Sequence, residues 1–340
     1  MSFKLKTTSV FLAAALLGAS ATQASAADIS GRSMKFSYAV SATNPVGLAV
    51  NKFIEVAKEK SGGKFKITGY PDAQLGNEIQ SMSSAQGGIV ELSVVSTAGA
   101  TSNVKELGIF DLPFMFHSVE EADAVIDGPV GKKLLEKFPS KNLIGLCYWD
   151  YGFRQVTNSK HPIQKLEDFN GLKLRVLQNS IYIDTFKALG ANPLPLPYPE
   201  TYTALESKAI DGQESSYLVT QSSGYQEIQP YLTETQHVFL PAVVLVSKRF
   251  WDKLNADERA VLSDSCSESV TYFRQVSRQM EKDVVKELVG AGMKFNTIDP
   301  EQKARLIEAT ASVTKKYKAQ LGAELVDETL ATIQKVRGKQ

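Results

Sequence analysis

The chain has 340 residues, of which 43% are hydrophobic and 22% charged, and its formal net charge is +1. A nearly neutral chain without a long basic run gives no reason to expect nucleic acid as a partner. The length suggests about two domains, because single cores usually stop growing near 250–300 residues. After the N-terminal segment, no stretch reaches the roughly 18 uninterrupted apolar residues of a membrane span.

The first residues predict export. Lys4 and Lys6 precede the apolar run SVFLAAALLGASA, and an A-x-A cleavage site follows at 24–26. A positive region, a short apolar region and small residues at the cleavage site are the parts of a secretory signal peptide. We therefore predict a signal peptide at 1–26, a mature chain that starts near Ala27, and a location in the periplasm.

Strand and helix patterns alternate along the mature chain. Residues 34–40 alternate apolar and polar side chains like a half-buried strand, and a helix follows from Pro45 to the glycine pair at 62–63. This alternation favours an α/β architecture with a mostly parallel sheet. Further strands are predicted at 64–70, 89–97, 142–149, 153–158 and 173–176, and further helices at 77–88, 118–126 and 180–190.

The later part of the chain has two distinct segments. The run NPLPLPYPE at 192–200 contains Tyr198, and its prolines have a fixed φ angle, so it should be a rigid extended connector. Residues 256–289 are nearly free of helix breakers and predict one helix long enough to brace two lobes. More polar helices are expected between this helix and the C-terminus.

The two cysteines are far apart in sequence. Cys147 lies in an apolar strand pattern and Cys266 in a helical pattern. An exported protein can form disulfides, but the stability of so long a chain should come from its core. We expect two buried, free thiols.

Motifs that carry catalysis are missing from the sequence. The three histidines, His117, His161 and His237, are isolated and lack the spacing of metal ligands. There is no G-x-S-x-G elbow, no phosphate-binding P-loop and no G-x-G-x-x-G fingerprint. We predict no catalytic residues, no metal site and no cofactor.

The segment GLKLRV, residues 171–176, reads as a short strand whose polar face carries Arg175. Arg175 is either a solvated arginine at a sheet edge or an arginine directed at an anion. Further upstream, aromatic residues crowd around Arg154 in the run YWDYGFRQVTN. They form either the edge of a core with an ion-paired arginine, or a pocket in which arginines hold an anion through paired hydrogen bonds. Composition alone leaves both interpretations open.

Five short motifs occur in an order that resembles a known family. They are AQLG (73–76), DLPFMF (111–116), GFRQVTNSKHPI (152–163), DFNGLKLRV (168–176) and DGQE (211–214). In order and approximate spacing they resemble the DctP-type substrate-binding proteins of the tripartite ATP-independent periplasmic (TRAP) transporters. The resemblance covers almost the whole mature chain.

The resemblance implies a set of ligand-binding residues. Arg175 matches the arginine that forms a two-pronged salt bridge with the ligand carboxylate, and Arg154 matches a second arginine of the pocket. Tyr198 falls where the family often places an aromatic ring against the ligand. Glu78 and Ser96 match positions that often contact the distal part of the ligand.

At one position the sequence departs from the family pattern. Many members carry asparagine directly after DGQE, and its side chain helps to hold the carboxylate, whereas this chain has Ser215. A shorter hydroxyl reaches less far, so this third carboxylate contact is either lost, mediated by water or replaced by a neighbour.

The resemblance also implies the fold. We expect an α/β periplasmic binding protein with two lobes, a hinge and a cleft, and with the long helix bridging the lobes. One lobe should comprise 28–152 and 241–280, and the other 153–240 and 281–340.

The predicted function is capture of an organic acid and its delivery to the integral membrane subunits of a TRAP transporter, by a monomer. Hydroxyl and amide side chains near the arginines favour a sugar acid such as an aldonate or a uronate. A C4-dicarboxylate, a keto acid or an aromatic acid is the alternative ligand. The alternative functions are a periplasmic enzyme that acts on the same acid and a ligand sensor module.

Overall fold

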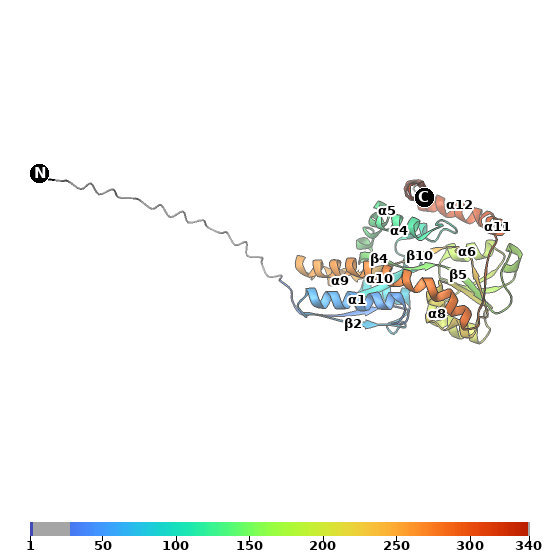
Figure 1. Cartoon of the computed structure of the whole chain (residues 1–340), viewed down its shortest axis with the longest axis horizontal. Coiled ribbons are helices and arrows are strands. Elements are labelled where there is room, and N and C mark those ends of the chain that lie inside the picture. The colour runs from blue at the N-terminus through green and yellow to red at the C-terminus, as the bar shows by residue number, and fades with distance from the viewer. Residues whose placement is uncertain (3–27, 339–340) are drawn as a thin grey trace.

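A computed structural model describes residues 1–2 and 28–338 of the chain (Figure 1). Nearly all of the predicted signal peptide at 1–26 lies outside the described residues. Within the described part, no helix combines the length and the apolar character needed to cross a membrane.

Two sheets organise the chain. The first has the strand order β2-β1-β3-β10-β4, and the second has the order β11-β9-β5-β8-β6-β7. The strands of the first sheet are β1 (Arg32–Ser37), β2 (Phe65–Tyr70), β3 (Leu92–Ser96), β4 (Leu143–Phe153) and β10 (Phe239–Ser247). Those of the second are β5 (Gln155–Asn158), β6 (Lys173–Val176), β7 (Asn192–Pro195), β8 (Gly212–Ser215), β9 (Tyr231–Glu234) and β11 (Lys294–Thr297).

Helices cover both sheets, and side chains fix where several of them begin. Asn77 and Gln80 form a capping box at the start of α2, and Ser118 caps α4 by accepting a hydrogen bond from the Glu121 amide. The helices are α1 (Pro45–Lys60), α2 (Glu78–Gly87), α3 (Thr97–Ala100), α4 (Val119–Asp127), α5 (Pro129–Leu135), α6 (Ser180–Ala188), α7 (Thr201–Glu206), α8 (Tyr217–Ser222), α9 (Lys248–Trp251), α10 (Ala256–Gly290), α11 (Pro300–Ala309), α12 (Ala311–Leu321) and α13 (Ala323–Arg337).

The chain passes between the sheets along two adjacent strands. It leaves the first sheet between β4 and β5 and returns between β9 and β10. The Arg154 amide donates a hydrogen bond of 2.8 Å to the Val238 carbonyl, so the outgoing and returning segments lie side by side. Because they run in opposite directions, β10 pairs antiparallel with β3 and β4, and β5 pairs antiparallel with β8 and β9. Among the described residues, five strand pairings are parallel and four are antiparallel, so both sheets are mixed and less uniformly parallel than expected.

The long helix α10 is a third connection between the two halves. Its first half packs Leu262 and Phe273 into the core of the first sheet, and its last turns pack Val284 and Leu288 beside β9 of the second sheet. In Figure 1 it runs from the side of α1 to the side of α8. The predicted α/β fold with two lobes bridged by a long helix is confirmed.

A disulfide joins Cys147 of β4 to Cys266 of α10, with their Cα atoms 6.0 Å apart. The expectation of two free thiols is wrong. The strand and the helix pack against each other in the first lobe, so two residues separated by 119 positions in sequence become neighbours in space.

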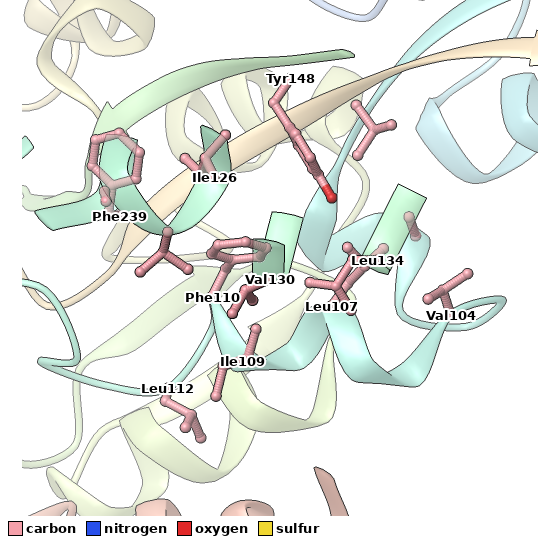
Figure 2. Close-up of a cluster of buried hydrophobic side chains, with 14 of the residues drawn as sticks. Val104, Leu107, Ile109, Phe110, Leu112, Ile126, Val130, Leu134, Tyr148 and Phe239 are labelled. Atoms are coloured by element: carbon pink, nitrogen blue, oxygen red, sulfur yellow. The ribbon is translucent and has the colours of Figure 1, made fainter. Parts of the chain in front are cut away.

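The C-terminal helices pack on the core of the first lobe. Figure 2 shows part of this core, in which Leu107, Phe110 and Tyr148 pack together. Val313 of α12 and Ile333 of α13 belong to the same hydrophobic cluster. The lobe boundaries given above remain a prediction, and this packing favours placing residues 311–337 with the first lobe instead of the second.

Candidate functional site

A cavity lies between the two lobes, and both lobes contribute to its lining. Its volume is about 40 Å³. The six side chains predicted to bind a ligand, which the sequence spreads over 138 positions, all line this one cavity. They are Glu78, Ser96, Arg154, Arg175, Tyr198 and Ser215.

A second cavity continues the first one along the cleft. The two share Glu78, Ser96, Arg175, Leu177 and Tyr198, and the second has further residues of its own, among them Gln178. The space beside Arg175 and Glu78 is therefore elongated, and it extends past both charged groups.

Arg175 enters the cavity wall from the middle of a short, buried strand. Its neighbours Leu174 and Val176 are fully buried in the core of the second lobe, so the alternation along β6 turns Arg175 to the other face. Only 2% of the surface of Arg175 is exposed. The solvated-edge interpretation of this arginine is therefore wrong.

The guanidinium of Arg175 has N–H donors that are not used in hydrogen bonds within the described chain. Its Nε donates a hydrogen bond of 2.9 Å to the Leu196 carbonyl, and within the described chain it makes no other hydrogen bond and no salt bridge. Its terminal nitrogens keep some exposed surface, and because Arg175 lines the cavity we infer that they face it. Burial lowers the pKa of Arg175. A buried charge without a counterion is costly, and an anion in the cavity would remove that cost.

Arg154, in contrast, already has a counterion. Its Nη2 donates a hydrogen bond of 2.9 Å to Oε1 of Glu214, and its Nε also bonds the Glu214 carboxylate. Burial alone would raise the pKa of Glu214, but the charge of Arg154 and hydrogen bonds from His237 and Arg154 lower it. Arg154 therefore lines the cavity as half of a buried ion pair.

His237 completes this buried network. Its Nε2 lies 3.1 Å from Oε2 of Glu214, and its Nδ1 lies 2.8 Å from the hydroxyl of Thr235. Because Glu214 is an acceptor, we assign the proton to Nε2, so that Nδ1 accepts from Thr235. Burial lowers the pKa of His237, which favours the neutral ring.

Glu78 places a carboxylate on the first-lobe wall of the cavity. It accepts hydrogen bonds from the Ser96 amide at 3.1 Å, from the Ser96 hydroxyl at 2.6 Å and from the Tyr151 hydroxyl at 3.3 Å. Burial raises its pKa, against the lowering effect of these hydrogen bonds and of Arg175. A carboxylate has about four acceptor positions, so Glu78 keeps one for a donor in the cavity.

The AQLG motif shapes the backbone that leads to Glu78. Gly76 has a φ of +102°, and a Cβ there would lie 2.8 Å from Cβ of Gln80. Only glycine fits that position. The turn allows Asn77 to cap α2, which places Glu78 in its first turn at the cavity.

Hydroxyl groups make up much of the remaining polar lining. The hydroxyl of Tyr198 lies 2.7 Å from that of Ser223, and the hydroxyl of Ser215 lies 3.2 Å from that of Thr220. Burial raises the pKa of Tyr198, so the phenol is neutral. These groups can donate or accept hydrogen bonds as a ligand requires.

The sequence reasoning missed several residues around the cavity. Tyr151 had been grouped with its aromatic neighbours, but only Tyr151 lines the cavity, whereas Trp149 stacks on Phe36 and Phe273 in the core. Gln213 and Tyr225 also line it. Tyr151 and Trp149 are two positions apart, so the alternation of β4 predicts both side chains on the same face of the strand. The sequence pattern therefore could not show that only one of them lines the cavity.

In the described part of the chain, no group of three or more His, Cys, Asp or Glu side chains is placed to hold a metal ion. The chemistry that the cavity offers is therefore one uncompensated cation, one carboxylate and several hydroxyl groups. This set is suited to holding an anion that also carries hydrogen-bond donors.

Comparison with known proteins identifies the family. Residues 36–320 match the sequence profile of DctP, bacterial extracellular solute-binding protein family 7. The chain belongs to the DctP family. This confirms the resemblance drawn from the five motifs.

Three relatives show what DctP proteins are reported to bind. The sugar acid binding protein DctPAm of Advenella mimigardefordensis, solved in complex with galactonate, is 42% identical with a TM-score of 0.89, covering 91% of this chain and 99% of that one. The 2,3-diketo-L-gulonate-binding periplasmic protein YiaO of Escherichia coli is 32% identical, over 82% of this chain and 85% of that protein. A TRAP periplasmic solute binding protein of Sulfurospirillum deleyianum, solved with succinate, is 29% identical with a TM-score of 0.85, covering 89% and 100%.

Proposed function

We propose that this DctP-family protein captures the carboxylate of a sugar acid, an aldonate or a uronate, in the periplasm and delivers it to the membrane subunits of a TRAP transporter. The observation that carries the proposal is the buried guanidinium of Arg175, whose terminal nitrogens open onto the cavity without a counterion. A carboxylate matches the planar fork of donors and replaces two hydrogen bonds to water at once.

Glu78 is the reason to favour a sugar acid over a C4-dicarboxylate. It lines the same two cavities as Arg175, so atoms of a ligand held at Arg175 lie near this carboxylate. A hydroxyl group satisfies Glu78 in either protonation state, since it can both donate and accept. A second ligand carboxylate would put two like charges together in a buried site unless a proton is taken up.

The relatives support the same choice. DctPAm, with 42% identity, was solved with galactonate, whereas the protein solved with succinate has 29% identity. The N-terminal signal pattern and the Cys147–Cys266 disulfide both agree with export to an oxidising compartment. Membership of the family supports membrane subunits as the partner, and we propose that the protein works as a monomer.

A panel of acids tests the proposal. Galactonate, galacturonate and erythronate should raise the melting temperature of the purified protein, and succinate should do so much less. An acid present at 100 times its dissociation constant adds about 2.7 kcal/mol of stability. If no acid raises the melting temperature, the proposal is refuted. If succinate raises it as much as galactonate does, the preference for a sugar acid is refuted.

The same samples separate binding from catalysis. Galactonate incubated with the protein should be recovered unchanged by NMR, because the proposed role is binding alone. Conversion of the acid would support the alternative of a periplasmic enzyme.

The Glu78→Gln variant tests the role of the carboxylate. It should lose affinity for galactonate and gain relative affinity for succinate, because an amide does not repel a second carboxylate. In the wild type, any succinate binding should take up a proton, which titration calorimetry in buffers of different ionisation enthalpy detects. Equal proton uptake by wild type and variant would contradict this role of Glu78.

A further inference from the structure

The side chain of Asn179 connects the two lobes next to the ligand cavity. It lies in the second lobe between β6 and α6, and it is 6% exposed. Its Oδ1 accepts a hydrogen bond of 2.8 Å from the Ile181 amide and so caps α6. Its Nδ2 lies 3.1 Å from the Ala98 carbonyl, 3.1 Å from the Thr101 hydroxyl and 2.9 Å from Oδ2 of Asp111, and all three acceptors belong to the first lobe.

Asp111 is a rigid acceptor for this amide. It is fully buried, and its chain neighbours Phe110 and Leu112 are fixed in the apolar cluster of Figure 2. Its Oδ1 has no hydrogen-bond partner, so the bond from Asn179 is the one that satisfies this carboxyl group. Without the Asn179 amide the carboxyl group of Asp111 would have no hydrogen-bond partner, and an unsatisfied buried polar group lowers the stability of the folded protein by about 1–3 kcal/mol.

Both ends of this contact adjoin ligand-facing residues. Asn179 follows Arg175 by four positions, and Leu177 between them lines the cavity. On the first lobe, Ala98 follows the cavity residue Ser96 by two positions. The contact therefore bridges the lobes where the wall that carries Arg175 meets the wall that carries Ser96.

We propose that Asn179 is a positioning residue that latches the closed cleft: its amide joins Asp111, Thr101 and Ala98 when the lobes close on a ligand and releases them when the lobes open. This inference rests on the proposed function, because the latch holds an acid against Arg175. The latch adds no contact to the ligand. It lengthens the lifetime of the complex by stabilising the closed form alone.

The test compares two variants that separate the latch from the helix cap. Asn179→Asp keeps an acceptor that caps α6 but cannot donate. The proteins are compared at about pH 9, above the pKa of Asp111, where Asp111 cannot donate to the new side chain and the two carboxylates repel each other. Asn179→Ala loses both functions. The control is Ser118→Ala, which removes the cap of α4, away from the cavity and the latch.

The readouts are the association and dissociation rates of galactonate in stopped-flow experiments and the thermal stability of each protein. Both Asn179 variants should release galactonate at least tenfold faster than the wild type, with the association rate changed by less than about twofold. Ser118→Ala should lower the melting temperature and leave the dissociation rate unchanged.

Different results overturn different claims. If the wild type binds galactonate and Asn179→Asp releases it at the wild-type rate, the latch is refuted while the proposed function stands. The same holds if the Asn179 variants lose thermal stability but keep their rates, because that is the behaviour of a cap alone. If the wild type binds none of the sugar acids, the proposed function is refuted, and with it the latch that depends on it.

Discussion

Arg175, which is buried, and Glu78, which is half-buried, are side chains of opposite charge that line one cavity. They differ in how many hydrogen bonds the protein gives them. Glu78 accepts three hydrogen bonds from the first lobe, whereas Arg175 donates one. The remaining N–H donors of Arg175 have no acceptor within the described chain, so we expect the ligand to provide one. The ligand end that meets Glu78 must supply a donor.

The carboxyl group of Asp111 should make the free energy of unfolding depend on pH. Burial raises the pKa of its carboxyl group from the ordinary value of 3.8 to about 8. Between these two values the folded protein holds the proton more tightly than the unfolded chain does, so the contribution of Asp111 to stability falls as the pH rises and is lowest above about pH 8.

The Asp111→Asn variant removes this titration. Its free energy of unfolding, relative to that of the wild type, should increase from pH 5 to pH 8, by up to about 1.4 kcal/mol for each pH unit. Urea denaturation of both proteins at several pH values measures the difference. Parallel pH profiles would show that Asp111 is ionised in the folded protein.

Residue-level prediction from sequence succeeded where a motif fixes the backbone. The AQLG turn positions Glu78, and the strand pattern of GLKLRV turns Arg175 away from the core. The pattern placed Arg175 on the polar face of a strand, and the family resemblance supplied the expectation that both residues face a ligand. The pairing of Arg154 with Glu214 could not be read from the sequence, because the two residues are 60 positions apart. The bond from Asn179 to Asp111 spans 68 positions, and no local pattern encodes it.

At the scale of elements, the disulfide between β4 and α10 was the main surprise. Each cysteine lies in the kind of element that its local pattern predicted, a strand and a helix. What the sequence lacked was the packing of that helix over that strand. Similarly, the proline run at 192–200 was expected to be a connector, but its first part is β7, a parallel edge strand beside β6. Prolines are tolerated there because an edge strand leaves some amides unpaired.

The disulfide closes a loop of more than 100 residues in the unfolded chain, so its removal should cost stability. In the chain-entropy account a 100-residue loop corresponds to about 4.7 kcal/mol, and removal of native disulfides typically costs about 2–5 kcal/mol. The double variant Cys147→Ser, Cys266→Ser should therefore unfold at lower urea concentration. Thiol titration of the wild type in denaturant without reductant should find no free thiol, and two thiols per chain would contradict the assignment.

For the whole molecule, sequence periodicity predicted the α/β class and the long helix, because both depend on local pattern. It could not predict the mixed sheets, which arise from the chain crossing between lobes and returning alongside itself. Nor could it place α12 and α13, since a polar helix does not show which core its apolar stripe covers. The cleft between the lobes followed from the family resemblance, and the structure then brought all six expected residues to it.

The central claim is that Arg175 holds the carboxylate of the ligand, and calorimetric titration of wild type and variants with galactonate tests it most directly. Arg175→Ala should weaken binding by about 2–5 kcal/mol, which is a loss of roughly 30-fold to several thousand-fold. Arg175→Lys should recover only part of this loss, because an ammonium group keeps the charge without the planar fork.

The control for this titration is Arg249→Ala, which removes an exposed arginine that donates to the Gly87 carbonyl and does not line the cavity. Its dissociation constant should equal that of the wild type within about twofold, as for most surface substitutions. A dissociation constant of Arg175→Ala within the same twofold range would contradict the carboxylate clamp and the site built around it.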